Sequence, residues 1–195
     1  MNMLTATHDW MRLFEGEPAG DLMRALPEIL QARRWFGGKA RRIQKVDFLD
    51  CIAISSDSLS MLLLIRVEYE QAGIETYTLP LTAAFADEAE RIQREIPTAV
   101  IAPFVLQRGA NTENGLLYDA LWNRDFTLAL LSAVRHDTWL NGLKGGVAAS
   151  STSAFTDLMP SGVKPEPVVM KSEQSNTSVA YSGYVILKLY RRVEE

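Results

Sequence analysis

The chain has 195 residues, of which 47% are hydrophobic and 23% charged, a composition ordinary for a soluble protein of one large or two small domains. The net charge of -4 disfavours a nucleic-acid partner, since phosphate recognition usually leaves a basic face. The single cysteine, Cys51, excludes an internal disulfide, and without a signal peptide or a membrane-length apolar run, the sequence predicts a cytoplasmic protein with no membrane partner.

The first 20 residues contain an apolar cluster before a break rich in Gly and Pro. We expect a short amphipathic turn docked on the body, with a frayed end. From Asp21 the apolar residues follow helical spacing, Pro27 suits a first turn, and Gly37-Gly38 suits a stop. The pattern predicts one helix, or two abutting ones, ending near Trp35.

Three strand-like runs come next, at residues 43–54, 59–70 and 74–81. The turn signals between them are Asp57-Ser58 and residues 71–73. Short turns join antiparallel strands, so these runs predict an antiparallel meander with one face covered by helices.

The middle of the chain predicts a helix at 83–96, ended by Pro97, and a strand at 99–107. Pro103 interrupts that strand and indicates an edge or a bulge. Residues 108–114 are rich in turn formers, and 115–118 predict a short strand.

A further amphipathic helix follows, for which Asp119 or Asp125 is the expected cap. His136 lies at its end, and neither of the two histidines has partners spaced for a metal, so we predict no metal site. Residues 141–166 are rich in Gly, Ser and Pro and predict a linker or long loop.

The last stretch predicts three short strands, at 168–171, 179–181 and 184–190, with Ser182-Gly183 as a tight turn. Small polar residues in the loop 173–178 are suited to surround phosphate oxygens with hydroxyl and backbone N–H groups. They are Ser175, Asn176, Thr177 and Ser178. Lys188 is flanked by two leucines, so alternation places it on the opposite face of its strand. This is the layout of a kinase amino-terminal lobe, although an ordinary hairpin has the same pattern.

Two motifs support the kinase interpretation. One is Glu173-Gln174-Ser175-Asn176-Thr177-Ser178-Val179 followed by Leu187-Lys188-Leu189-Tyr190-Arg191-Arg192, and the other is Arg34-Trp35-Phe36-Gly37-Gly38-Lys39-Ala40-Arg41. The first resembles the start of the kinase core in bacterial maltokinases, including the maltokinase-like part fused to some trehalose synthases. The second resembles the signature of that family's amino-terminal cap, and the two motifs occur in the family's order.

The resemblance implies transfer of the γ-phosphoryl group of ATP to the anomeric hydroxyl of maltose. It implies that Lys188 holds the ATP phosphates and that the loop 175–178 lies over them. The catalytic aspartate, the Mg²⁺ ligands and most of the sugar pocket are expected in a larger lobe beyond Glu195. We therefore expect no catalytic residue or metal ligand in this chain, and no activity of the chain alone.

The predicted fold class is α+β: an antiparallel sheet with helices packed on it, followed by the first strands of a kinase-like lobe. The predicted parts are an N-terminal segment (1–20), a cap domain (21–140), a linker (141–166) and the start of the lobe (167–195). The partners implied are ATP, maltose or a related sugar, and a trehalose synthase. The alternatives are another sugar kinase, for example one acting on glucosamine, or a noncatalytic binding module.

Overall fold

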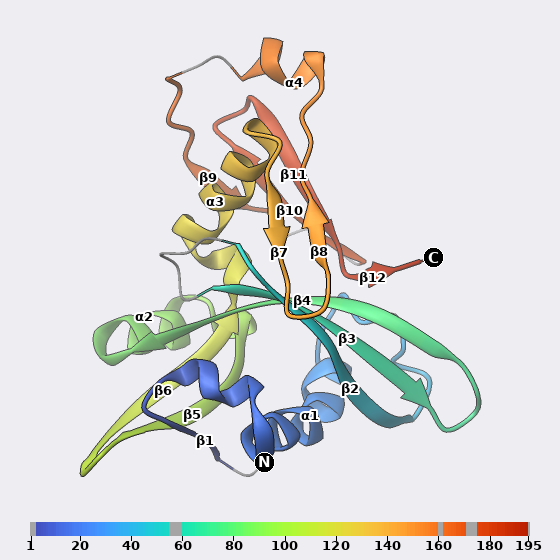
Figure 1. Ribbon diagram of the computed structural model, residues 1–195, viewed down its shortest axis with the longest axis vertical. Helices are drawn as coiled ribbons and strands as arrows, with labels where there is room; N and C mark the ends of the chain where they lie inside the picture. Colours follow the sequence, from blue (N-terminus) through green and yellow to red (C-terminus); the bar gives the residue numbers. More distant parts are fainter. Residues whose placement is uncertain (1–2, 55–59, 160–161, 171–174, 195) are drawn as a thin grey trace.

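The computed structural model describes residues 3–54, 60–159, 162–170 and 175–194. A seven-stranded sheet runs in the order β1-β5-β6-β4-β3-β2, with β12 also paired to β4. Its strands are β1 (Leu4–Thr7), β2 (Ile43–Ala53), β3 (Met61–Tyr69), β4 (Ile74–Phe85), β5 (Val100–Arg108), β6 (Asn111–Asp119) and β12 (Arg192–Val193). Figure 1 shows helix α1 on one side of this sheet, and helix α3 with a second sheet on the other. The predicted α+β class is confirmed.

Strands β2, β3 and β4 form the predicted antiparallel meander. Their side chains alternate between two cores. Leu63 and Ile65 of β3 pack with α1 (Gly16–Gln31), whereas Leu62 packs with α3 (Arg124–Arg135) on the other side. Burial on both faces explains why these strands are nearly continuous apolar runs. The predicted turn at Asp57-Ser58 lies outside the described residues.

The N-terminal region is more ordered than we predicted. Strand β1 pairs in parallel with β5 and buries Leu4 and Ala6, so the expected fraying is wrong for this segment. The amphipathic turn is a 3₁₀ helix, η1 (Trp10–Phe14), with Asp9 as its cap. Helix α1 begins at Gly16 rather than Asp21 and ends at Gln31. It is one continuous helix with Pro27 in its interior rather than in its first turn.

Strands β5 and β6 form a longer hairpin than the sequence indicates. Their ladder extends to the pair Arg108 and Asn111, so the connection is only Gly109-Ala110 rather than residues 108–114. Pro103 precedes the first residue of β5 that pairs with β1, and a register shift lies between Val100 and Ala102. The irregularity therefore lies before Pro103, which itself pairs with Leu116 in regular register; the predicted edge is found up to Pro103, and β5 is internal beyond it.

The helices after β4 and β6 are close to prediction. Helix α2 (Ala86–Glu95) is followed by a 3₁₀ turn, η2 (Pro97–Ala99). After β6, the expected helix is divided into η3 (Ala120–Trp122) and α3. Asp119 caps η3, and α3 is capped by Asn123 instead of Asp125, since the Asn123 side chain accepts the Phe126 N–H at 2.9 Å.

The predicted linker contains secondary structure. A hairpin of β7 (Trp139–Asn141) and β8 (Gly146–Ala148) is followed by α4 (Ser153–Leu158). The buried carboxylate of Asp50 accepts three backbone N–H groups of the hairpin turn, from Leu143, Lys144 and Gly145. This long-range anchor has no signature in the local composition, which is why the hairpin was not predicted.

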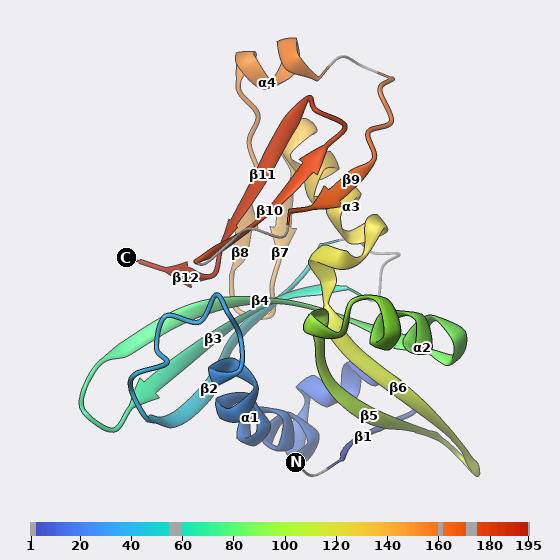
Figure 2. The same ribbon diagram turned by 180° about the vertical axis from the view of Figure 1, so that it is seen from behind.

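The C-terminal strands are β9 (Pro167–Val169), β10 (Asn176–Tyr181) and β11 (Val185–Tyr190), in an antiparallel sheet of order β11-β10-β9. The predicted turn is confirmed, because Ser182 and Gly183 both have positive φ, at 48° and 79°. This sheet packs on α3, where the Tyr181 hydroxyl donates to the Thr127 carbonyl at 2.7 Å. Figure 2 shows how the chain then returns through β12 to the large sheet.

Candidate functional site: the lysine strand and its junction with the cap

Lys188 lies on the exposed face of the β9-β10-β11 sheet. Leu187 and Leu189 point to the opposite face and pack in the core shared with α3, as the alternation predicts. Ser178 is the direct neighbour of Lys188 on β10. The lysine side chain is therefore available on an open sheet surface.

The surface around Lys188 is apolar. Ile186 pairs with Ala180, which in turn pairs with Val168, so these three residues and Lys188 share one face. Val168 is 60% exposed and Ile186 57% exposed, although β-branched residues are usually buried. Among the described residues, this face thus combines exposed apolar side chains with the cation of Lys188.

The residues predicted to form the phosphate loop are mostly in a strand. Asn176, Thr177 and Ser178 pair with β11, and only Ser175 precedes the ladder. Ser178 is 2% exposed. The expected loop location is wrong for these three, because their backbones continue the ladder opposite residues 188–190. Residues 173 and 174 of the predicted loop lie outside the described residues.

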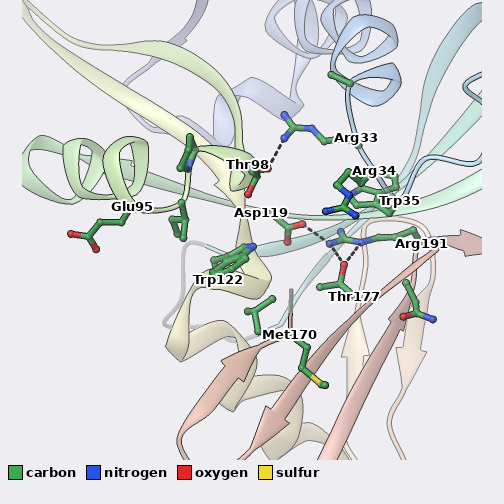
Figure 3. Close-up of a pocket in the computed structure, with 15 residues that line it drawn as sticks. Arg33, Arg34, Trp35, Glu95, Thr98, Asp119, Trp122, Met170, Thr177 and Arg191 are labelled. Carbon is green, nitrogen blue, oxygen red and sulfur yellow. Dashed lines mark hydrogen bonds and ion pairs between the residues drawn. The ribbon is translucent and has the colours of Figure 1, made fainter. Parts of the chain in front are cut away.

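The side chain of Thr177 is bound by Arg191, a residue for which the sequence predicted no role. The Arg191 guanidinium donates to the Thr177 hydroxyl at 2.8 Å and 3.1 Å and forms an ion pair with Asp119 at the end of β6. It also lies over the ring of Trp35, 4.8 Å from its centroid. Figure 3 shows this cluster. An arginine after an apolar strand is common in sequences, so nothing local indicates this burial.

The Arg34–Arg41 motif continues from the end of α1 and anchors that end of the cap. The preceding Arg33 donates to the carbonyls of Thr98 and Val100, and Phe36 packs in the core with Tyr77. This agrees with a structural role for the aromatic residues beside the glycine pair.

Glu75 is the anionic centre of a second cluster in the same region. Tyr69 and Tyr77 donate to its carboxylate at 2.6 Å and 2.7 Å, and Arg41 and Arg192 pair with it. Burial alone raises the pKa of Glu75, but the hydrogen bonds from these partners outweigh it and lower the pKa to about 2. Arg192 belongs to β12, so this carboxylate links the C-terminal strand to the cap.

A pocket of about 480 Å³ lies where the two motifs meet. Arg34 and Trp35 line it from the cap side, and Asn176, Thr177 and Arg191 line it from the C-terminal segments. Residues more than 140 positions apart in the chain, such as Arg34 and Asn176, therefore contribute to one cavity.

The described residues contain neither a cluster of metal-ligating side chains nor a membrane-length helix. Within them, no group of three or more His, Cys, Asp and Glu side chains is arranged to hold a metal ion. None of the helices in the described ranges is long and apolar enough to span a membrane. His136 ends α3, where its Nδ1 lies 2.8 Å from the Ser132 carbonyl oxygen.

Comparison with known families gives a match for the region that contains the Arg34–Arg41 motif. Residues 30–122 match the family model of the maltokinase N-terminal cap domain. The match extends from the last turn of α1 through η3 and includes the whole Arg34–Arg41 motif. Over these residues the chain is therefore similar to a maltokinase N-terminal cap domain.

Proposed function

We propose that this chain forms the cap and the start of the nucleotide-binding lobe of an ATP-dependent sugar kinase, whose acceptor is maltose and whose product is maltose 1-phosphate. The observation that carries the proposal is the cap domain at residues 30–122, followed by an antiparallel sheet with Lys188 exposed on its third strand. A kinase lobe places its phosphate-binding lysine on such a strand.

The exposed face of the small sheet supplies the contacts that ATP requires. Val168, Ala180 and Ile186 offer an apolar surface for the adenine ring, and Lys188 offers a point charge for the phosphates. Mg²⁺, when bound, would neutralise charge on the transferred phosphoryl group. We propose that its ligands and the catalytic aspartate belong to a second lobe that follows residue 195.

The cap, in this proposal, positions the strand that carries Thr177. Arg191 joins Thr177 to Asp119 of the cap, and it lies three residues after Lys188. A fixed cap would therefore hold the start of β10 and the end of the lysine strand together. This assigns Arg191 the role of a positioning residue.

The test is an assay of the enzyme translated from the complete reading frame, with ATP-Mg²⁺ and maltose, glucosamine or glucose as acceptors. Phosphorus NMR would identify an anomeric phosphate. We expect maltose 1-phosphate to form, with Lys188→Ala at least a hundredfold slower and the exposed control Lys164→Ala unchanged. Phosphorylation of glucosamine in place of maltose would reassign the acceptor. Equal rates for the two lysine variants would refute the role of Lys188.

A further inference from the structure

The pocket between the cap and β10 is separate from the exposed face that carries Lys188. Val169 and Thr177, which line the pocket, point to the side of the small sheet opposite Lys188, whereas Asn176, at the start of β10, lines the pocket from the Lys188 side. Val168, Ala180, Ile186 and Lys188 do not line the pocket. In Figure 3, Arg34, Trp35 and Arg191 lie on one side of the pocket, and Trp122 and Glu95 on the other. A ligand here would not occupy the surface proposed for ATP.

The pocket contains more positive than negative charge. Three arginines line it, Arg33, Arg34 and Arg191, against the carboxylates of Asp119 and Glu95. Asp119 is already paired with Arg191. Glu95 is paired with arginines of its own helix, Arg91 at 3.3 Å and Arg94 at 2.9 Å.

Two of the three arginines have no carboxylate partner. Arg33 donates hydrogen bonds to two backbone carbonyls, those of Thr98 and Val100. Arg34 is exposed and makes no hydrogen bond or ion pair with the residues that the structure describes. Burial lowers the pKa of Arg33, and the neighbouring Arg191 charge lowers it further against the opposing effect of Asp119. Two uncompensated cations beside one cavity favour a divalent anion.

Unsatisfied donors point the same way. The Nε of Arg33 and the Nη1 of Arg191 are buried without a hydrogen-bond partner among the described residues. Arg191 as a whole is 1% exposed. Leaving a buried charged donor unpaired costs free energy, and that cost would be recovered by an acceptor oxygen delivered into the pocket.

The other residues that line the pocket are suited to contact a sugar ring or another small ring. Trp35 and Trp122 are half-buried on the two sides of the pocket, and Ile96, Pro97 and Val169 add apolar surface. Aromatic faces stack on the C–H faces of sugars as well as on planar rings. A volume of about 480 Å³ lies within the range for small-molecule sites.

We propose that this pocket binds a sugar-sized phosphate monoester, with the phosphate between the arginines and the ring against the tryptophans. A phosphate monoester carries a charge near -2 at neutral pH, which matches the two cations that lack a carboxylate. Bound there, the ligand lies against Arg191 and Thr177, so its occupancy stabilises β10 where that strand leaves the predicted phosphate loop. The pocket can bind this ligand whether or not ATP binds on the other face.

The experiment is a titration of the 195-residue protein with glucose 6-phosphate, followed by tryptophan fluorescence and by calorimetry. Trp35 and Trp122 are half of the four tryptophans in the chain and make the fluorescence sensitive to the pocket. We expect a saturable change with glucose 6-phosphate and affinity at least tenfold weaker for glucose, which lacks the phosphate. Inorganic phosphate, which lacks the ring, should bind more weakly than the sugar phosphate.

Matched variants locate the binding. Arg34→Gln should weaken glucose 6-phosphate binding at least tenfold, while Arg42→Gln, whose side chain is 80% exposed outside the pocket, should not change it. Both should keep the thermal midpoint of the parent protein, since neither arginine is buried. Lys188→Ala should also leave this binding unchanged. The proposal is overturned if no saturable binding is observed, if glucose binds as tightly, if the two arginine variants behave alike, or if Lys188→Ala abolishes binding.

Discussion

Arg191 and Asp119 form a buried ion pair between two segments separated by 72 positions in the chain. Their side chains are 1% and 9% exposed, respectively. Asp119 ends β6 in the cap, whereas Arg191 follows the lysine strand and also donates to Thr177. The pair therefore connects the segment matched by the cap-domain model with the segment that follows Lys188.

Breaking this pair from one side should be strongly destabilising. Asp119→Asn keeps an oxygen to cap η3 at Leu121 but leaves the Arg191 charge unpaired in the interior. We expect a loss of about 3 kcal/mol in the free energy of unfolding, measured by urea denaturation.

The double variant Asp119→Asn, Arg191→Met measures the interaction energy between the two side chains apart from their contacts with other residues. It removes the unpaired charge, so its loss should be smaller than the sum of the two single losses. Additive losses would show that the two residues do not interact.

The Glu75 cluster predicts a particular response to acid. Because the pKa of Glu75 is about 2 in the folded protein and ordinarily 4.5, its contribution is complete above pH 4.5 and is lost as the pH falls towards 2. Glu75→Gln should therefore lower stability near neutral pH by ~2 kcal/mol and flatten its decline over that window.

A control for this behaviour is available at the same end of the sheet. Glu70 pairs with Arg42 at 3.9 Å, but its side chain is 47% exposed, so solvent screens the interaction. Glu70→Gln should keep the parent's acid profile in urea or thermal unfolding. A parent-like acid profile for Glu75→Gln would contradict the assignment.

The glycine pair of the cap motif has unequal roles. A Cβ at Gly38 would lie 2.7 Å from the Phe36 ring and 2.8 Å from the Tyr69 ring, whereas one at Gly37 would lie 3.7 Å from its nearest neighbour, the Tyr77 hydroxyl. We expect Gly38→Ala to lower the free energy of unfolding by roughly 1–3 kcal/mol through overpacking, as measured by thermal unfolding.

Gly20→Ala provides the opposite expectation. Gly20 lies inside α1, and its added Cβ would meet only the end of the flexible Arg24 side chain, at 3.2 Å. Alanine is the better helix former, so this variant should be neutral or more stable by up to about 1 kcal/mol. Equal losses for Gly20→Ala and Gly38→Ala would mean that crowding at Tyr69 is not the cause.

The sequence predicted what local periodicity controls. The meander of β2, β3 and β4, helix α2 and the turn at Ser182-Gly183 all have short-range signals of alternation, spacing or turn chemistry. The position of Lys188 opposite its flanking leucines followed from the same alternation.

Long-range partners account for what was missed. Strand β1 is four residues long and is defined by its pairing with β5, and β12 is defined by its pairing with β4. Arg191 resembles any surface arginine until Asp119 and Thr177 are brought beside it by the fold. The same reason applies to the strand at Thr177, which polar composition predicted to be a loop.

Asp50 gives the last prediction, since a single carboxylate holds the β7–β8 turn against β2. Its oxygens accept the N–H groups of Cys51, Leu143, Lys144 and Gly145 at 2.7–3.1 Å. In Asp50→Asn, one oxygen becomes an amide nitrogen that faces a backbone donor, so we expect a loss of about 2 kcal/mol and faster amide hydrogen exchange in the turn. Asp47→Asn, on the same strand but in partly exposed pairs with Lys45 and Arg66, should cost less than about 1 kcal/mol. Unchanged exchange at Leu143 and Gly145 in Asp50→Asn would show that the hairpin is held by its other contacts, because the carboxylate is the group that this substitution alters.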